Sequence, residues 1–108
     1  MVLSSLPASS IRTLRSRARR ISLGYLEVFY LANDLGVNRL GVIVSKKVSK
    51  KAVDRNRAKR LVREAVRGFI LGPTTNFDYL IIVRSAEILE KSPRDMETTL
   101  QGALPKKS

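Results

Sequence analysis

The apolar positions of the chain fall into runs that predict three β-strands. Residues 24–33 (GYLEVFYLAN) are rich in aromatic and β-branched side chains and end at the turn signal Asn33-Asp34. Residues 39–45 (RLGVIVS) predict a second strand, which can pair with the first as an antiparallel hairpin. The continuous apolar run of residues 79–84 (YLIIVR) is typical of a strand that is buried on both faces.

Between the strands, apolar residues recur at helical spacing. Residues 10–20 carry a thin apolar stripe among five arginines, and residues 54–67 form a longer helix that Gly68 ends. A weaker helix is expected over residues 86–102. The order of elements is therefore α-β-β-α-β-α, with room for one further short strand, and it predicts the α+β class.

The length of the chain predicts one domain over residues 1–108, because there is no room for a second core of useful size. We expect residues 1–9 and 104–108 to be flexible. No apolar run approaches the roughly 18 residues that a membrane-spanning helix needs. The Arg- and Ser-rich beginning resembles an organellar transit peptide, but the other features favour a cytoplasmic protein.

The chain is strongly basic, and the charge is concentrated. Lys and Arg number 21 against 9 Asp and Glu, which gives a net charge of +12. Residues 39–67 hold eleven basic and two acidic residues and so carry +9 of that total. A charge gathered in this way points to a negatively charged partner, either nucleic acid or an anionic membrane surface.

The residue types that are missing exclude several kinds of chemistry. The sequence contains neither Cys nor His. Disulfides, metal sites built from Cys or His, thiol nucleophiles and Ser-His catalytic relays are therefore excluded. The acidic residues are scattered, whereas a metal-dependent nuclease needs them clustered. We expect no catalytic residue and no metal ligand on this chain.

The helix expected over residues 54–67 has two faces. At 100° per residue, Arg60, Arg63 and Arg67 lie near Asn56 on one face. The opposite face is apolar and comprises Ala58, Leu61, Val62, Ala65 and Phe69. The stacked arginines repel one another, and Glu64 relieves only part of this by reaching Arg60. We interpret the basic face as a phosphate-binding surface, and a solvated surface without a partner is the alternative.

Two segments in this order resemble the bacterial ribonuclease P protein component. The stretch RLGVIVSKKVSKKAVDRNRAKRLVREAVR (39–67) is similar to the signature region of that family, with its Ser-Lys-Lys turn and its RNR helix. The stretch FDYLIIVR (77–84) is similar to the strand that follows. The resemblance implies a two-layer α/β sandwich in which a left-handed βαβ crossover joins parallel strands of a central sheet.

The resemblance also implies a function. The family is the small protein subunit of a ribonucleoprotein that removes the 5′ leader from precursor tRNA. Its partners are the catalytic RNA subunit and precursor tRNA, and neither a membrane nor a small-molecule substrate is expected. The chemistry belongs to the RNA, with Mg²⁺ held mainly by that RNA. The protein helps to hold the catalytic RNA, contacts the leader and raises the affinity for the metal ions.

The family motifs, together with the helix face, mark the expected RNA-binding residues of this chain: Lys46, Lys47, Arg55, Asn56, Arg57, Lys59, Arg60, Arg63 and Arg67. A leader-binding cleft is implied between the first helix and the sheet. Phe29 fits its floor and Arg12 and Arg15 its helical wall, although Phe29 can equally be a core residue. Ile11 stands where the family often has phenylalanine, so we expect this helix to contact RNA phosphates through its arginines rather than bases through an aromatic ring.

Three other functions explain parts of the sequence. A non-catalytic RNA-binding protein, such as a ribosomal component, accounts for the charge but not for the ordered motifs. A protein-only nuclease needs the clustered carboxylates that the chain lacks. A membrane-surface peptide would carry a wide, bulky apolar stripe, whereas the helix has small aliphatic residues opposite its basic face.

Overall fold

The computed structural model of the chain describes residues 3–69 and 76–102. Within them the elements are β1 (Leu3–Ser5), α1 (Ala8–Arg17), β2 (Arg19–Ser22), β3 (Leu26–Ala32), β4 (Asn38–Val44), α2 (Ala52–Phe69), β5 (Phe77–Val83), the 3₁₀ helix η1 (Ala86–Glu90) and α3 (Pro93–Gln101). The predicted α+β class and the order of the six main elements are confirmed. Two short strands, β1 and β2, are present where the sequence left room for one.

The described strands form one mixed sheet in the order β1-β4-β5-β3-β2. β5 pairs in parallel with β4 on one side and antiparallel with β3 on the other. The predicted hairpin between β3 and β4 is therefore wrong, because β5 lies between them. The reason is burial: six consecutive residues of β5 are buried, so this strand takes an interior position where both faces are covered.

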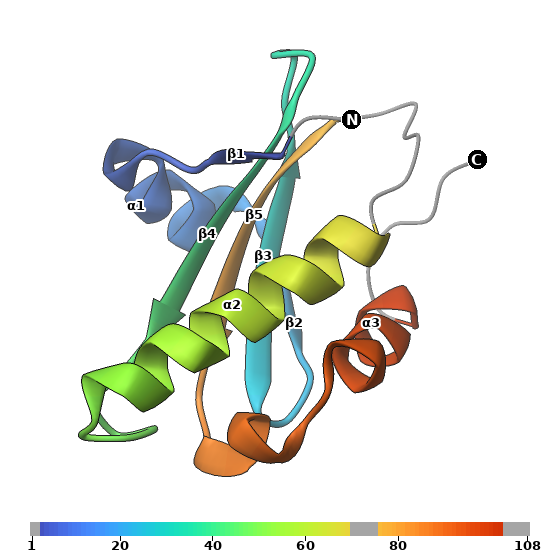
Figure 1. Cartoon of the computed structure of the whole chain (residues 1–108). Helices are drawn as coiled ribbons and strands as arrows, with labels where there is room; N and C mark the ends of the chain where they lie inside the picture. Colours follow the sequence, from blue (N-terminus) through green and yellow to red (C-terminus); the bar gives the residue numbers. More distant parts are fainter. Residues whose placement is uncertain (1–2, 70–75, 103–108) are drawn as a thin grey trace.

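β4, α2 and β5 form a crossover of the rarer hand. In Figure 1, β4 and β5 run downward, α2 lies in front of the sheet, and β5 lies to the right of β4. With the helix in front and the strands pointing down, a step to the right makes the connection left-handed, opposite to the great majority of such units. The left-handed crossover that the resemblance implies is confirmed.

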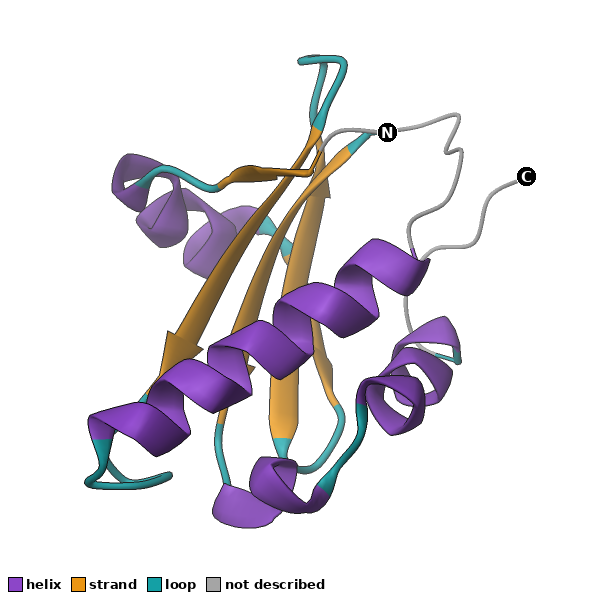
Figure 2. Ribbon diagram, viewed as in Figure 1, coloured by secondary structure: helices purple, strands orange, loops and turns teal. Residues whose placement is uncertain are grey.

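Helices cover both faces of the sheet (Figure 2). On one face, α2, η1 and α3 pack on the sheet, and Val62 and Met96 are fully buried in this larger core. On the other face, α1 packs over a smaller cluster in which Leu14 lies with Phe29 and Leu80. The sandwich therefore consists of the sheet with α2 and α3, and α1 adds a cover on the far face.

Regular structure extends into residues 3–9, for which the sequence predicts flexibility. Leu3–Ser5 pair in parallel with β4, and the Leu6 amide donates a hydrogen bond to the Leu40 carbonyl at 3.0 Å. Leu6 packs closely over Gly41, where an added Cβ would lie 3.1 Å from its Cδ2. A three-residue strand is too short to show alternation in the sequence. Residues 104–108 lie outside the described part of the chain.

The helix predicted over residues 86–102 is divided between η1 and α3. The Ser92 hydroxyl accepts a hydrogen bond from the Asp95 amide at 3.1 Å, and the Asp95 carboxylate accepts one from the Ser92 amide at 3.0 Å. This capping box, with Pro93 at the first helical position, starts a new helix. Within the described residues, no helix is long and apolar enough to cross a membrane.

Candidate nucleic-acid interface

α2 seats one face against the sheet and presents the other to solvent. Ala58, Val62 and Ala65 are 0% exposed, and Leu61 is half-buried. The side chain of Phe69, predicted on the same face, lies outside the described part of the structure. The predicted basic face is exposed: Asn56, Arg57, Arg60, Arg63 and Arg67. Lys59 is half-buried at its edge. The two faces predicted from the helical spacing are confirmed.

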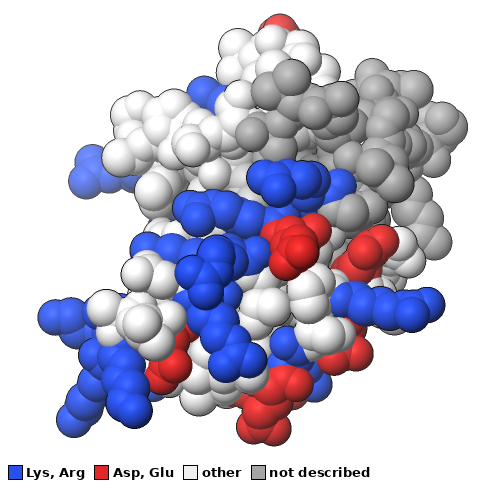
Figure 3. All heavy atoms as spheres, in the orientation of Figure 1, with Lys and Arg blue, Asp and Glu red and all other residues white. Residues whose placement is uncertain are grey.

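The three stacked arginines of α2 have no partner among the described residues. Arg60, Arg63 and Arg67 make neither a hydrogen bond nor an ion pair within that part of the chain. The expected contact from Glu64 to Arg60 is not formed within 4.0 Å. Lys and Arg side chains gather over α2 in Figure 3. Their mutual repulsion is therefore left for a negatively charged partner to relieve.

The connection before α2 is tied down by polar contacts. The Ser49 hydroxyl donates a hydrogen bond to the Asp54 carboxylate at 2.9 Å, and the Arg55 guanidinium donates one to the Ser49 carbonyl at 2.9 Å. Arg55 is half-buried, so it orders this turn in addition to carrying charge. Lys46 and Lys47 are exposed just before it and extend the basic face beyond the helix.

The residues predicted for a leader-binding cleft lie on the opposite side of the sheet. Arg12 and Arg15 are exposed on α1. Phe29 is 5% exposed and packs with Leu14 and Leu80 under α1. The structure therefore places Phe29 in the smaller core, with little of its ring open to a nucleobase. The sheet separates this set from the basic face of α2 (Figure 1).

Two buried carboxylates bind arginines that the sequence analysis did not single out. Glu27 accepts hydrogen bonds from Arg84 and Arg20. The bond from Arg84 has the largest effect on the pKa of Glu27. Together with the bond from Arg20 it holds this pKa below its usual value, although burial acts to raise it. An acidic residue inside an apolar strand was the available signal, because a buried carboxylate needs a partner. Its partner could not be identified from spacing alone.

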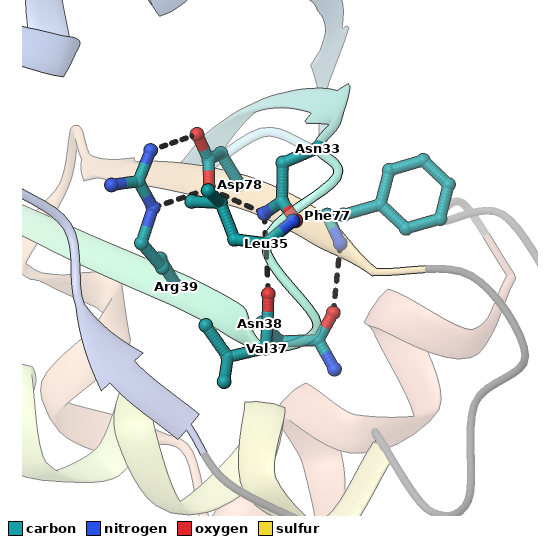
Figure 4. Close-up of polar contacts among 7 residues, drawn as sticks. All are labelled: Asn33, Leu35, Val37, Asn38, Arg39, Phe77 and Asp78. Carbon is teal, nitrogen blue, oxygen red and sulfur yellow. Dashed lines mark hydrogen bonds and ion pairs between the residues drawn. The ribbon is translucent and has the colours of Figure 1, made fainter.

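Asp78 is the second buried carboxylate (Figure 4). It accepts two hydrogen bonds from Arg39, at 2.7 and 2.6 Å, and one from Asn33 at 2.7 Å. Burial acts to raise the pKa of Asp78, but the bonds from Arg39 and Asn33 outweigh it and leave the pKa below its usual value. Arg39 therefore serves the fold, although it belongs to the basic stretch of the sequence.

The described residues offer no donor set for a metal ion. No group of three or more acidic side chains comes together within residues 3–69 and 76–102. The two buried carboxylates are occupied by arginines, as described above. No site for Mg²⁺ is therefore assigned to these protein side chains.

Comparison with known proteins identifies the family. The family model for ribonuclease P matches residues 7–107. The ribonuclease P protein component of Thermoanaerobacter sp. (strain X514) is 31% identical over 91 residues, which cover 84% of this chain and 77% of that protein. That of Xanthomonas oryzae pv. oryzae is 39% identical over 93 residues, which cover 82% of this chain and 63% of that protein.

The fold points the same way. The ribonuclease P protein of Thermotoga maritima superposes with a TM-score of 0.75 at 26% identity, over 94% of each chain. That of Staphylococcus aureus superposes with a TM-score of 0.75 at 20% identity, over 94% of this chain and 92% of that chain. From the family match, the related sequences and the shared fold together, we conclude that this chain belongs to the ribonuclease P protein family.

Proposed function

We propose that this chain binds the catalytic RNA of ribonuclease P and the 5′ leader of precursor tRNA, and thereby assists removal of the leader. Membership of the family makes the chain a protein component of a ribonucleoprotein. The proposal adds which RNA segments the protein contacts and what the contact does. A cytoplasmic location goes with this proposal and stays a prediction.

The observation that carries the proposal is the exposed face of α2. Arg60, Arg63 and Arg67 project from a rigid helix whose other face is buried, and among the described residues none of them is neutralised. Guanidinium groups on a rigid support bind phosphates through paired N–H donors. Because this face has no carboxylate partner of its own within that region, a polyanion supplies the missing charge.

The chemistry of cleavage is assigned to the RNA. The buried acids Glu27 and Asp78 are held by arginines, and neither is free to act as a general base. When bound, Mg²⁺ stabilises the negative charge that develops during phosphodiester cleavage. The protein's part is to hold RNA strands close together and to lower their mutual repulsion, which favours binding of the metal ions by RNA.

Reconstitution tests this function directly. The purified chain, mixed with the catalytic RNA of a related ribonuclease P, should restore leader cleavage at a Mg²⁺ concentration at which the RNA alone is slow. A general RNA-binding protein of similar charge serves as the control and should not restore it. Cleavage by the chain without RNA, or no stimulation of the RNA, would contradict the proposal.

The basic face of α2 can be tested within the same assay. Replacing Arg60 and Arg63 together by Ala should weaken assembly by roughly 10- to 100-fold for each arginine lost, because each charge-assisted hydrogen bond is worth about 1.5–3 kcal/mol. The fold should be kept, since both side chains are exposed. Arg94→Ala, at an exposed position of α3, is the control for the loss of one positive charge and should assemble normally. If it weakens assembly as much as Arg60→Ala or Arg63→Ala does singly, only net charge matters.

A further inference from the structure

Glu27 is a buried carboxylate on the side of the sheet that α1 covers. Its side chain is 5% exposed, and it shares this face of β3 with Phe29, two positions along. The register places Glu27 opposite Ser22 of β2 and Ile82 of β5, so strands flank it on both sides. A charge in such a place is retained only with partners.

Two arginines meet at this carboxylate from opposite sides. Arg20 of β2 donates from Nε to one oxygen, and Arg84, which follows β5, donates from Nη2 to the other. The Arg84 amide also donates a hydrogen bond to the Tyr25 carbonyl at 2.8 Å, which fixes its backbone to the start of β3. The two guanidinium groups are therefore anchored close together.

Arg20 and Arg84 are held by Glu27 but keep N–H donors that can bind a ligand. Their side chains are 62% and 49% exposed, for Arg20 and Arg84 respectively, although Glu27 beneath them is buried. Each guanidinium group donates one N–H to the Glu27 carboxylate. The other N–H donors of the two guanidinium groups have no partner in the described part of the chain. Two forks of N–H donors, fixed in place and open to solvent, suit a phosphate.

We propose that Arg20 and Arg84 form a phosphodiester-binding site for RNA and that Glu27 is its positioning residue. The site lies on the α1 side of the sheet and is separate from the basic face of α2. The inference rests on the proposed function, because RNA of the ribonucleoprotein supplies the phosphodiester. Glu27 limits the freedom of two long side chains before RNA arrives, which lowers the entropy cost of binding.

The decisive comparison is Glu27→Gln against Glu90→Gln. Both raise the net charge by one, and Glu90 is exposed on η1. Charge alone predicts tighter RNA binding by both variants. If Glu27 positions the arginines, Glu27→Gln should instead bind a short unstructured RNA oligonucleotide roughly tenfold more weakly, as for one lost charge-assisted hydrogen bond. Glu90→Gln should bind at least as tightly as the unchanged protein. Binding by Glu27→Gln as tight as by Glu90→Gln would overturn the positioning role.

Arginine variants test the site itself. Arg20→Ala should lower the affinity and reduce the slope of log K against log salt by about 0.7, the value for one phosphate contact on single strands. Arg94→Ala is the matched control. Thermal unfolding followed by circular dichroism verifies the fold. Should Arg20→Ala, which leaves Glu27 with Arg84 as its one arginine partner among the described residues, not fold, Arg84→Lys keeps a positive charge beside Glu27 but loses the fork, and it should still weaken binding. Folded Arg20→Ala and Arg84→Lys proteins that bind like the control would refute the site.

Two further arms identify the RNA. Weaker binding of precursor tRNA with a long leader, but not of one with the leader cut to a single nucleotide, assigns the site to the leader. Weaker assembly with the catalytic RNA assigns it there, and an effect on neither overturns the inference. Failure of the unchanged chain to stimulate the catalytic RNA would instead count against the proposed function. The comparison of Glu27→Gln with Glu90→Gln measures binding to a short RNA oligonucleotide and does not depend on that stimulation.

Discussion

Asp78 shows how a single residue settles the conformation of a distant loop. It lies opposite Arg39 in the parallel register and accepts hydrogen bonds from Arg39 and Asn33 (Figure 4). Asn33 in turn donates to the Val37 carbonyl at 3.2 Å and accepts from the Leu35 amide at 3.0 Å. The loop between β3 and β4 is thus tied to β5, which separates these strands in the sheet.

We expect Asp78→Ala to lower the free energy of unfolding at neutral pH by roughly 3–5 kcal/mol, since it leaves the partly buried Arg39 unpaired. The difference should depend on pH. The pKa of Asp78 is lowered in the folded state, so its contribution is present above the ordinary value of 3.8 and is lost as the pH falls through the lowered pKa.

Urea unfolding of both proteins from neutral pH to below pH 3.8 measures this difference. Asp34→Ala, at an exposed acid in the same loop, is the control and should change stability by no more than about 0.5 kcal/mol. If the difference in the free energy of unfolding between Asp78→Ala and the unchanged protein grows as the pH falls, the ion pair of Asp78 with Arg39 is not its cause.

At the scale of elements, one face of α2 packs in the core and the opposite face is exposed and basic. Its inner face contributes Ala58, Val62 and Ala65 to the larger core, and its outer face holds the stacked arginines. Small side chains on the inner face let the helix lie close to the sheet. The burial of this face stabilises the helix despite the repulsion on the other, since helices in proteins owe most of their stability to packing.

Substitutions on the two faces should therefore separate stability from RNA binding. Val62→Ala removes two fully buried methyl groups and should cost about 2 kcal/mol of folding free energy, with little effect on RNA affinity once the protein is folded. Arg63→Ala should change stability by less than about 0.5 kcal/mol and weaken RNA binding. Chemical unfolding and an RNA binding titration on both proteins provide the comparison. The reverse pattern would mean that the faces are assigned wrongly.

At the scale of the whole molecule, the sheet stands between two basic surfaces. The exposed face of α2 lies on one side, and Arg12, Arg15 and the arginines held by Glu27 lie on the other. A single RNA segment bound to α2 is kept from the α1 side by the sheet. We therefore expect the protein to contact two separate RNA segments, and contact of Arg12 and Arg15 with the leader stays a prediction.

Salt should reveal both surfaces. Affinity for RNA should fall steeply with salt, with a slope of about −0.7 per phosphate contacted on single strands. Because the surfaces share no residues, the slope changes caused by Arg63→Ala and by Arg20→Ala should add in the double variant. Titrations at several salt concentrations measure this. A flat salt response, or a double variant no different from either single one, would argue against two phosphate-binding surfaces.

Much of the fold and of the α2 face could be predicted from the sequence, because both depend on neighbours along the chain. The helical spacing of Val62 and Arg63 separates the buried from the exposed face, and the apolar run of β5 indicates burial on both sides. The concentration of charge in residues 39–67 likewise needs no coordinates. These are properties of periodicity and composition, which act over a few residues.

The tertiary structure alone decided which distant segments meet. It placed β5 between β3 and β4, paired β1 with β4, and brought Arg20 and Arg84 to Glu27. It also placed Phe29 beneath α1, with little of its ring exposed. Strand pairing and buried ion pairs are chosen by competition among all the surfaces that folding can cover, so no local pattern encodes them.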